Sequence, residues 1–212
     1  MAAELARLLL AGGAEVNWIP VVHERDATPV PPNGIQSFGG SLLAPAPLHR
    51  IERGTLDVPL ESALTRDLRS RPTDAVVHLG VGARGSPNLL WIADRMGVSP
   101  FAIVRAEEIV CQRGNLIDAG GGACLRFEEP GHCGRCCSAS WLRRALASEV
   151  QNRLELVVAS LQVARGVIVR SESEATMLEQ VGVPRRNLWV ALPGHEVRAL
   201  AERLLGARGL HS

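Results

Sequence analysis

Apolar residues follow two spacings along the chain, one typical of amphipathic helices and one typical of buried strands. Helical spacing predicts helices over residues 2–12, 59–71, 87–97, 141–164, 171–181 and 196–205. Short continuous apolar runs predict strands over residues 15–22, 74–79, 100–104, 166–169 and 188–192. Because strands and helices alternate, we expect an α/β domain whose parallel sheet is covered by helices on both faces.

Local signals refine a few of these elements. Residues 23–47 are rich in Pro, Gly and Ser and predict a long loop. Pro59 suits the first turn of its helix. Ser171 followed by Glu174 fits a capping box, which predicts a helix beginning just after Ser171.

Composition narrows the functional classes. The chain has 212 residues, 46% of them hydrophobic, which is enough for one domain with a full core. A net charge of +1 gives no electrostatic case for binding nucleic acid or an anionic membrane. Every basic residue is Arg, which disfavours Lys-based chemistry. No apolar run reaches the roughly 18 residues of a membrane span, and the first residues make a poor signal peptide, so we expect a cytoplasmic protein.

All five cysteines lie in one segment, a cysteine-rich loop at residues 110–138 that follows a predicted strand. Four of them are spaced C-x12-C-x8-C-x2-C, namely Cys111, Cys124, Cys133 and Cys136. Four thiolates form a closed tetrahedral zinc site, and Gly134 would allow the tight turn of the last pair. Such a metal would hold together a loop too polar to pack by itself. Cys137 is an alternative to Cys136 and His132 an alternative to a thiolate; free thiols and disulfide or redox chemistry also remain open.

A histidine and a glycine-rich turn end the predicted strand 74–79. His78 could bind a ligand hydroxyl or act as a base, or it could be a structural histidine with satisfied partners. The turn that follows, GVGARGS, has glycines in G-x-G-x-x-G register at Gly80, Gly82 and Gly85. This register fits dinucleotide binding, but no acidic residue stands about 20 residues further on. We favour a turn that lines a binding cleft.

Charged residues end the predicted strand 100–104. Arg105, Glu107 and Glu108 stand beside the cysteine-rich loop. Paired carboxylates can serve acid–base chemistry, but adjacent residues of an extended chain point in opposite directions. We therefore expect polar residues that line a cleft, with Arg105 facing an anionic ligand.

The order of these motifs resembles the N-terminal half of a GT4-family glycosyltransferase, a retaining enzyme of GT-B fold. PTDAVVHLG resembles the strand that delivers a His toward the cleft. CQRGNL and the following CGRCC resemble the cysteine-rich loop of one branch of the family. Arg105-Ala106 stands where that branch has His-Asp. The resemblance implies a single Rossmann-like domain over residues 1–212, one half of a GT-B enzyme.

The resemblance also implies a function. The domain would bind a saccharide or lipid-linked acceptor, and its acceptor-binding residues would be His78, Gly80, Arg84, Arg105 and Glu107. The second domain, which carries the nucleotide-sugar donor site, has no counterpart in these 212 residues, so the chain would be split from its donor half or truncated. Sugar transfer would then need a donor domain in cis or from a partner chain. No catalytic residue is assigned, and the alternative is a non-catalytic, metal-stapled interaction module derived from such an enzyme.

Overall fold

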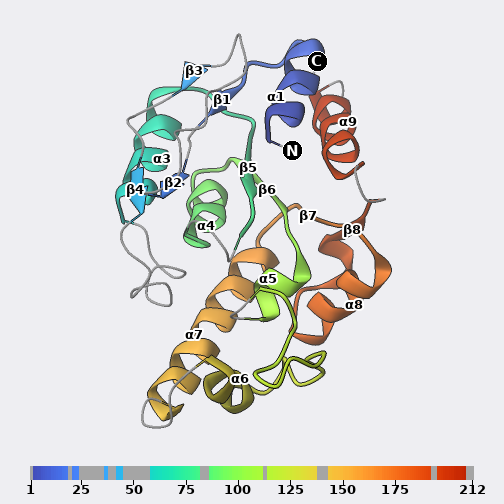
Figure 1. Ribbon diagram of the computed structural model, residues 1–212. Coiled ribbons are helices and arrows are strands. Elements are labelled where there is room, and N and C mark those ends of the chain that lie inside the picture. Colours follow the sequence, from blue (N-terminus) through green and yellow to red (C-terminus); the bar gives the residue numbers. More distant parts are fainter. Residues whose placement is uncertain are drawn as a thin grey trace.

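The centre of the computed structural model is a four-stranded parallel sheet (Figure 1). The structure describes residues 2–18, 21–23, 36–37, 42–44, 58–81, 86–111, 114–137, 143–191 and 195–208. The strands of the sheet are β5 (Ala75–Leu79), β6 (Ser99–Ile103), β7 (Gly166–Val169) and β8 (Leu188–Val190). They are hydrogen-bonded in chain order, so all carboxyl ends meet at one edge. The predicted parallel sheet is confirmed.

Helices connect and cover these strands. The helices are α1 (Ala2–Ala11), α3 (Val58–Ser70), α4 (Asn88–Arg95), α5 (Ala106–Val110), α6 (Pro130–Cys137), α7 (Arg143–Gln162), α8 (Glu172–Gln180) and α9 (Glu196–Arg208), with a 3-10 turn η2 (Arg185–Asn187). Each connection between neighbouring strands of the sheet contains at least one helix, as parallel pairing requires.

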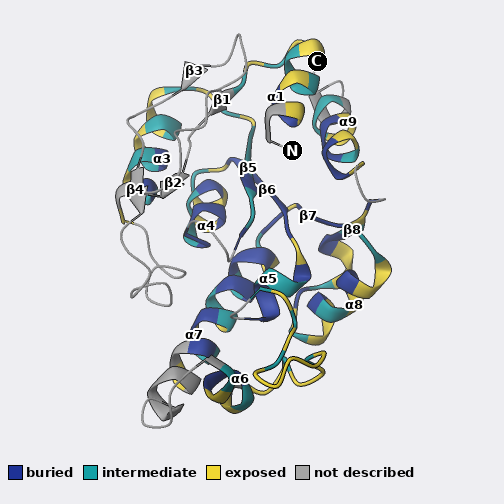
Figure 2. Ribbon diagram, in the orientation of Figure 1, coloured by how far each residue is buried: buried dark blue, intermediate teal, exposed yellow. Residues whose placement is uncertain are grey.

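Apolar side chains alternate between the two faces of the sheet, and each face has its own core. Ala102 and Val167 pack with α4, α5, α7 and α8 in the larger core cluster. Ile103 and Ile168, one residue further along each strand, pack with α1 and α9 in a second cluster. Figure 2 shows this burial along β6 and β7. Helices therefore cover both faces, as the sequence predicted.

A close approach between β7 and β8 requires a glycine. A Cβ added at Gly166 would lie 2.5 Å from the ring of Trp189. That ring also meets Phe101 at a centroid distance of 5.8 Å, and the guanidinium of Arg203 lies 4.0 Å from its centroid. The aromatic pair thus ties β6, β8 and α9 together on one face of the sheet.

Four short strands form two separate parallel pairs. β1 (Asn17–Trp18) pairs with β3 (Gln36–Ser37), and β2 (Val21–His23) pairs with β4 (Leu42–Ala44). In Figure 1 these pairs lie on one side of β5, and β6 to β8 lie on the other. The strand predicted over residues 15–22 is confirmed at residues 17–18 and 21–22. The loop predicted over residues 23–47 was wrong at β3 and β4, and residues 24–35, 38–41 and 45–47 lie outside the described ranges. The composition of that segment hid β3 and β4 because ladders of two or three residues carry little periodicity.

Two further helices differ from the sequence-based expectation. Residues 106–110, expected as the end of a strand, form the one-turn helix α5. Residues 130–137, expected within an irregular loop, form α6, and Gly134 lies inside this helix instead of in a tight turn. The last two residues of the cysteine pattern therefore stand one helical turn apart.

Candidate functional site at the carboxyl edge of the sheet

Polar side chains gather where the parallel strands end. His78 is the penultimate residue of β5, Arg105 follows β6, and Arg170 follows β7. Ligands of open α/β sheets bind outside the carboxyl ends of the strands. This edge is therefore the candidate binding site.

His78 is a buried imidazole near the end of β5. Only 7% of the residue is exposed, and among the described residues neither Nδ1 nor Nε2 has a hydrogen-bond partner. Burial lowers the pKa of His78 to about 4, while the nearby backbone of Ser86 acts in the opposite direction without completing a hydrogen bond. The ring is therefore neutral at pH 7, with one nitrogen able to donate and the other able to accept.

Ser86 joins the start of α4 to α3 beside this histidine. Its hydroxyl donates to the Glu61 carboxylate of α3 and accepts from the backbone N–H of Asn88 at 3.3 Å. Ser86 is fully buried, so both bonds lie inside the protein. The bonds position the first turn of α4, which follows the predicted glycine-rich turn.

A network of charged residues links the ends of β6 and β7, and Glu108 joins it through Arg105 at 3.7 Å. Glu107 Oε1 lies 2.9 Å from Arg105 Nη2 and 2.9 Å from Arg170 Nη2, so one carboxylate oxygen bridges two guanidinium groups. Arg170 Nε also donates to Glu174 at 3.0 Å. Glu174, and then Glu107, raises the pKa of Arg170. Arg105 is about half exposed, and its guanidinium is the part of the network most open to solvent.

Glu174 is held by a modified capping box. The Ser171 hydroxyl accepts from Glu174 N–H at 3.2 Å, as the Ser-x-x-Glu signal predicted. The Glu174 carboxylate accepts from the backbone N–H of Arg170 at 2.9 Å, one residue before the usual partner. The box therefore both starts α8 and orients the Arg170 side chain. Arg170 and Glu174 were not predicted as site residues, although a polar pair after a buried strand and a capping signal were present in the sequence.

The structure brings together only some of the expected acceptor-binding residues. Arg105 and Glu107 meet in an ion pair, whereas no hydrogen bond or ion pair joins His78 to them within the described ranges. Gly80 ends β5 with φ +77°, a left-handed conformation that favours glycine, and its N–H donates to Ile103 O at 3.0 Å. Arg84, with the rest of the predicted dinucleotide turn at residues 82–85, lies outside the described residues.

The cysteine-rich loop contains a small turn closed around Asp118. Asp118 Oδ1 accepts from the N–H groups of Gly120 at 2.8 Å and Gly122 at 3.0 Å. An antiparallel bridge joins Ile117 to Ala123, and Cys124 N–H donates to Leu116 O at 2.7 Å. The sequence predicted a loop too polar to pack by itself. The structure differs, because Leu116 and Phe127 pack against the larger core cluster.

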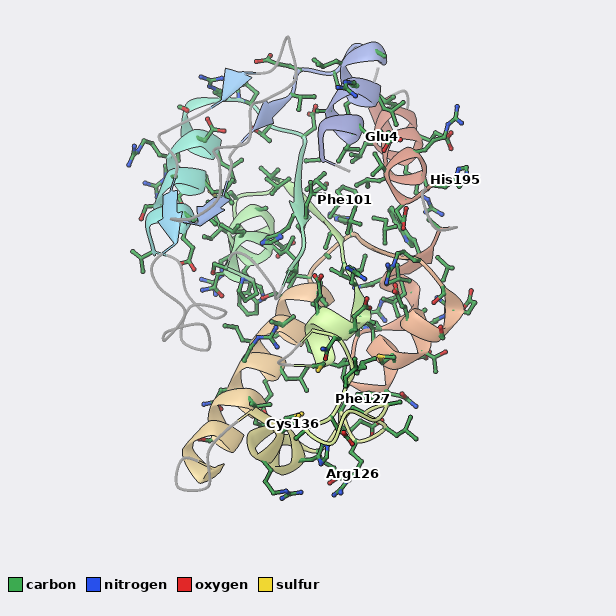
Figure 3. All side chains as sticks on the ribbon, viewed as in Figure 1. Glu4, Phe101, Arg126, Phe127, Cys136 and His195 are labelled. Atoms are coloured by element: carbon green, nitrogen blue, oxygen red, sulfur yellow. The ribbon has the colours of Figure 1, made fainter. Side chains whose placement is uncertain are left out.

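The loop lies at the far end of the molecule from the α1–α9 layer. Figure 3 shows Cys136, Phe127 and Arg126 near α6, well separated from Phe101 in the sheet and from Glu4 and His195. Its turn is exposed in Figure 2, whereas Cys133 on α6 is buried. The loop is thus anchored at its helical end.

The four cysteines of the predicted zinc site differ in burial. Cys111 and Cys133 are buried, and Cys124 and Cys136 are half-buried. Within the described ranges, no three His, Cys, Asp or Glu side chains are grouped closely enough to hold a metal ion. An all-sulfur donor set suits zinc by its chemistry. The zinc site stays a prediction.

Arg153 of α7 donates hydrogen bonds to the end of α5, just before the start of this loop. The residue is 4% exposed, and its guanidinium donates to the carbonyls of Ile109 at 3.0 Å and Glu108 at 2.9 Å. These carbonyls belong to the last turn of α5 and need partners from outside that helix. Burial lowers the pKa of Arg153, and the neighbouring Cys111 acts in the opposite direction. Sequence periodicity placed Arg153 on a helix but gave no sign of its burial.

A surface depression of about 710 Å³ lies along α3, lined by side chains between Val58 and Ser70 and by Ile92 of α4. Its lining does not include His78, Arg105 or Arg170. The depression is therefore separate from the candidate site.

Comparison with known proteins found no matching family model, curated protein or solved structure. None of the described helices has both the length and the hydropathy needed to cross a membrane.

Proposed function

We propose that this chain is the acceptor-binding domain of a glycosyltransferase of GT-B type. The observation that carries the proposal is His78, a buried neutral imidazole with no hydrogen-bond partner among the described residues, at the carboxyl end of a parallel strand. Leaving such nitrogens without partners costs about 1–3 kcal/mol per group, and such costs are concentrated at functional sites. A sugar hydroxyl both donates and accepts, so it suits this ring.

The charged network supplies the second part of the acceptor site in this proposal. Arg105 is about half exposed, and its guanidinium pairs with Glu107 at 2.9 Å and with Glu108 at 3.7 Å. Its remaining N–H groups can donate to acceptor hydroxyls or to the phosphate of a lipid-linked acceptor. In contrast to the expectation of a free arginine facing an anion, Arg105 would act from within an ion pair, which fixes its direction.

Transfer requires a nucleotide-sugar and a donor domain, in cis or as a partner chain. In the reaction, the acceptor oxygen forms the new glycosidic bond as the bond to the nucleoside diphosphate breaks. The acceptor proton leaves to a base, and the diphosphate takes the electron pair. This chain's contribution would be to bind and orient the acceptor, and none of its residues is assigned as catalytic.

Saccharide binding tests the proposal directly. We expect saturation-transfer NMR of the chain to detect at least one of glucose, galactose, mannose and N-acetylglucosamine at concentrations up to about 10 mM. His78→Phe should weaken that binding by about tenfold, equal to about 1.4 kcal/mol, because the apolar ring cannot hydrogen-bond. His195→Phe is the matched control, since His195 is exposed and lies outside the site. Absence of any saccharide signal, or equal effects of the two substitutions, contradicts the proposal.

A second candidate function is a non-catalytic interaction module that is stabilised by a structural zinc ion. Two observations favour it. Cys111 and Cys133 are buried, and Arg105-Ala106 replaces the His-Asp of the family that the chain resembles. Glycosyl transfer or nucleotide-sugar hydrolysis by the isolated chain would contradict this alternative, whereas zinc binding is compatible with both functions.

Metal analysis tests the zinc site itself. We expect protein purified without added metal to carry about one zinc per chain, bound by Cys111, Cys124, Cys133 and Cys136. Chelation should lower Tm by about 5–10 °C, which corresponds to about 2–3 kcal/mol for a chain of this size.

Single substitutions separate the ligands from their neighbour. Cys133→Ser should abolish zinc retention, and Cys137→Ser should leave it unchanged. Equal loss in both variants would place Cys137 in the donor set. Metal-free protein with an unchanged Tm after chelation would show that the thiols serve no metal.

A further inference from the structure

Helix α6 places two residues of the cysteine-rich loop one turn apart. Cys133 is the fourth residue of α6 and Cys136 is the seventh. Side chains three residues apart lie on the same face of a helix. Helical geometry puts the Cα atoms of such residues about 5 Å apart, within the range of about 4.4–6.8 Å that a disulfide can span. The backbone of α6 thus brings the two cysteines within reach of one sulfur–sulfur bond.

The other cysteines are less well placed to pair with Cys133. Cys111 follows α5, and Cys124 precedes α6, so neither belongs to this helix. Cys137 is the last residue of α6, four residues after Cys133. Residues four apart on a helix have Cα atoms about 6 Å apart, which makes Cys136 the nearer partner.

The two cysteines of the pair also differ in burial. Cys133 is 6% exposed on a helix that packs against α7, as Figure 1 shows. Cys136, labelled in Figure 3, is half-buried. A half-buried thiol can meet a small disulfide, and a buried thiol beside it can then displace the adduct. This is the division that a two-cysteine exchange reaction needs.

Oxidation of the pair changes the last turn of α6. Side chains three apart in an α-helix have Cβ atoms about 5–6 Å apart, whereas a disulfide needs about 3.5–4.5 Å. The turn therefore has to tighten toward 3-10 geometry, in which residues i and i+3 eclipse. This tightening costs free energy in the oxidised form, and strained disulfides are the easily reduced ones. We thus expect a reversible bond instead of a permanent one.

We propose that Cys133 and Cys136 form a redox site that undergoes thiol–disulfide exchange with a small disulfide such as oxidised glutathione. The Cys136 thiolate attacks one sulfur of the small disulfide, which forms a mixed disulfide and releases the other half as a thiolate. The Cys133 thiolate then attacks the Cys136 sulfur and releases the second half. The chain loses two electrons and two protons, and the small disulfide becomes two thiols.

The redox site is independent of the acceptor site proposed for the carboxyl edge of the sheet. It shares two sulfurs with the predicted zinc site. A bound metal ion would compete with oxidation, because both the metal and the exchange reaction need the thiolates. Exchange is therefore measured with a chelator present.

Tryptic mapping tests the pair directly, because Arg135 lies between the two cysteines. Cleavage after arginine gives the peptides 127–135 and 136–143, which separate unless a disulfide joins them. We expect the full chain, incubated with EDTA and about 1 mM oxidised glutathione and then alkylated, to yield the joined peptides at about 2 Da below their summed mass. Transfer into about 10 mM reduced glutathione before alkylation should separate them.

Two serine variants identify the partner of Cys133. Cys137→Ser should keep the joined peptides, whereas Cys136→Ser should reduce their yield by about tenfold or more. Peptides that stay separate in oxidised glutathione, or stay joined in reduced glutathione, would overturn the proposal. An undiminished link in Cys136→Ser, or a link from Cys133 to Cys111 or Cys124, would do the same.

Discussion

The pKa of His78 differs from that of a histidine in solution. Burial favours the neutral ring, and the described protein supplies neither nitrogen with a hydrogen bond. The folded-state pKa of about 4 lies below the ordinary value of 6.5. Protons therefore bind the unfolded chain more readily than the folded chain, and stability falls as pH falls from 6.5 toward 4.

This linkage predicts a pH-dependent free energy of unfolding. Between pH 7.5 and pH 4 the His78 contribution should fall by about 3 kcal/mol, because each pKa unit is worth about 1.4 kcal/mol. Urea denaturation at a series of pH values measures it. His78→Phe should remove that part of the pH dependence, whereas His195→Phe should leave it in place. Parallel pH profiles for the wild type and His78→Phe would refute this assignment.

At the scale of elements, a single buried arginine connects α7 to the end of α5. The short helix α5 leaves terminal carbonyls that need partners, and two of them receive hydrogen bonds from Arg153. The same turn leads directly into Cys111 and the cysteine-rich loop. Arg153 therefore fixes where the loop begins as well as how α5 packs.

Removing this contact should destabilise the fold. Arg153→Met keeps most of the aliphatic length but leaves the carbonyls of Glu108 and Ile109 without their donor. We expect the free energy of unfolding to fall by about 2–4 kcal/mol, as measured by urea denaturation. The control Arg165→Met alters an exposed arginine and should change stability by less than about 0.5 kcal/mol. A similar small change in both variants would show that the buried hydrogen bonds contribute little.

At the scale of the whole molecule, two apolar layers cover a four-stranded parallel sheet whose polar groups meet at one edge. The candidate acceptor site and the cysteine-rich loop both follow strand ends of this sheet.

Much of this architecture could be predicted from local pattern. Apolar residues at helical spacing predicted α1 and α9, and the continuous apolar run Gly166–Val169 predicted β7. These signals are readable because the side chains of each element meet the core at regular intervals. The Ser171 capping signal predicted the start of α8 because a cap is a contact between residues three apart. The position of His78 near the end of a strand could also be predicted, because the apolar run that contains it is a local pattern.

The sequence by itself determined the elements whose stabilising contacts are local or periodic, and the cysteine spacing that predicts zinc. Only the tertiary structure decided the burial of His78 and Arg153 and the sharing of Glu107 between Arg105 and Arg170. Each of these joins residues that are distant along the chain or depends on which strands become neighbours. No periodicity encodes such neighbours, because they are set by how the layers pack.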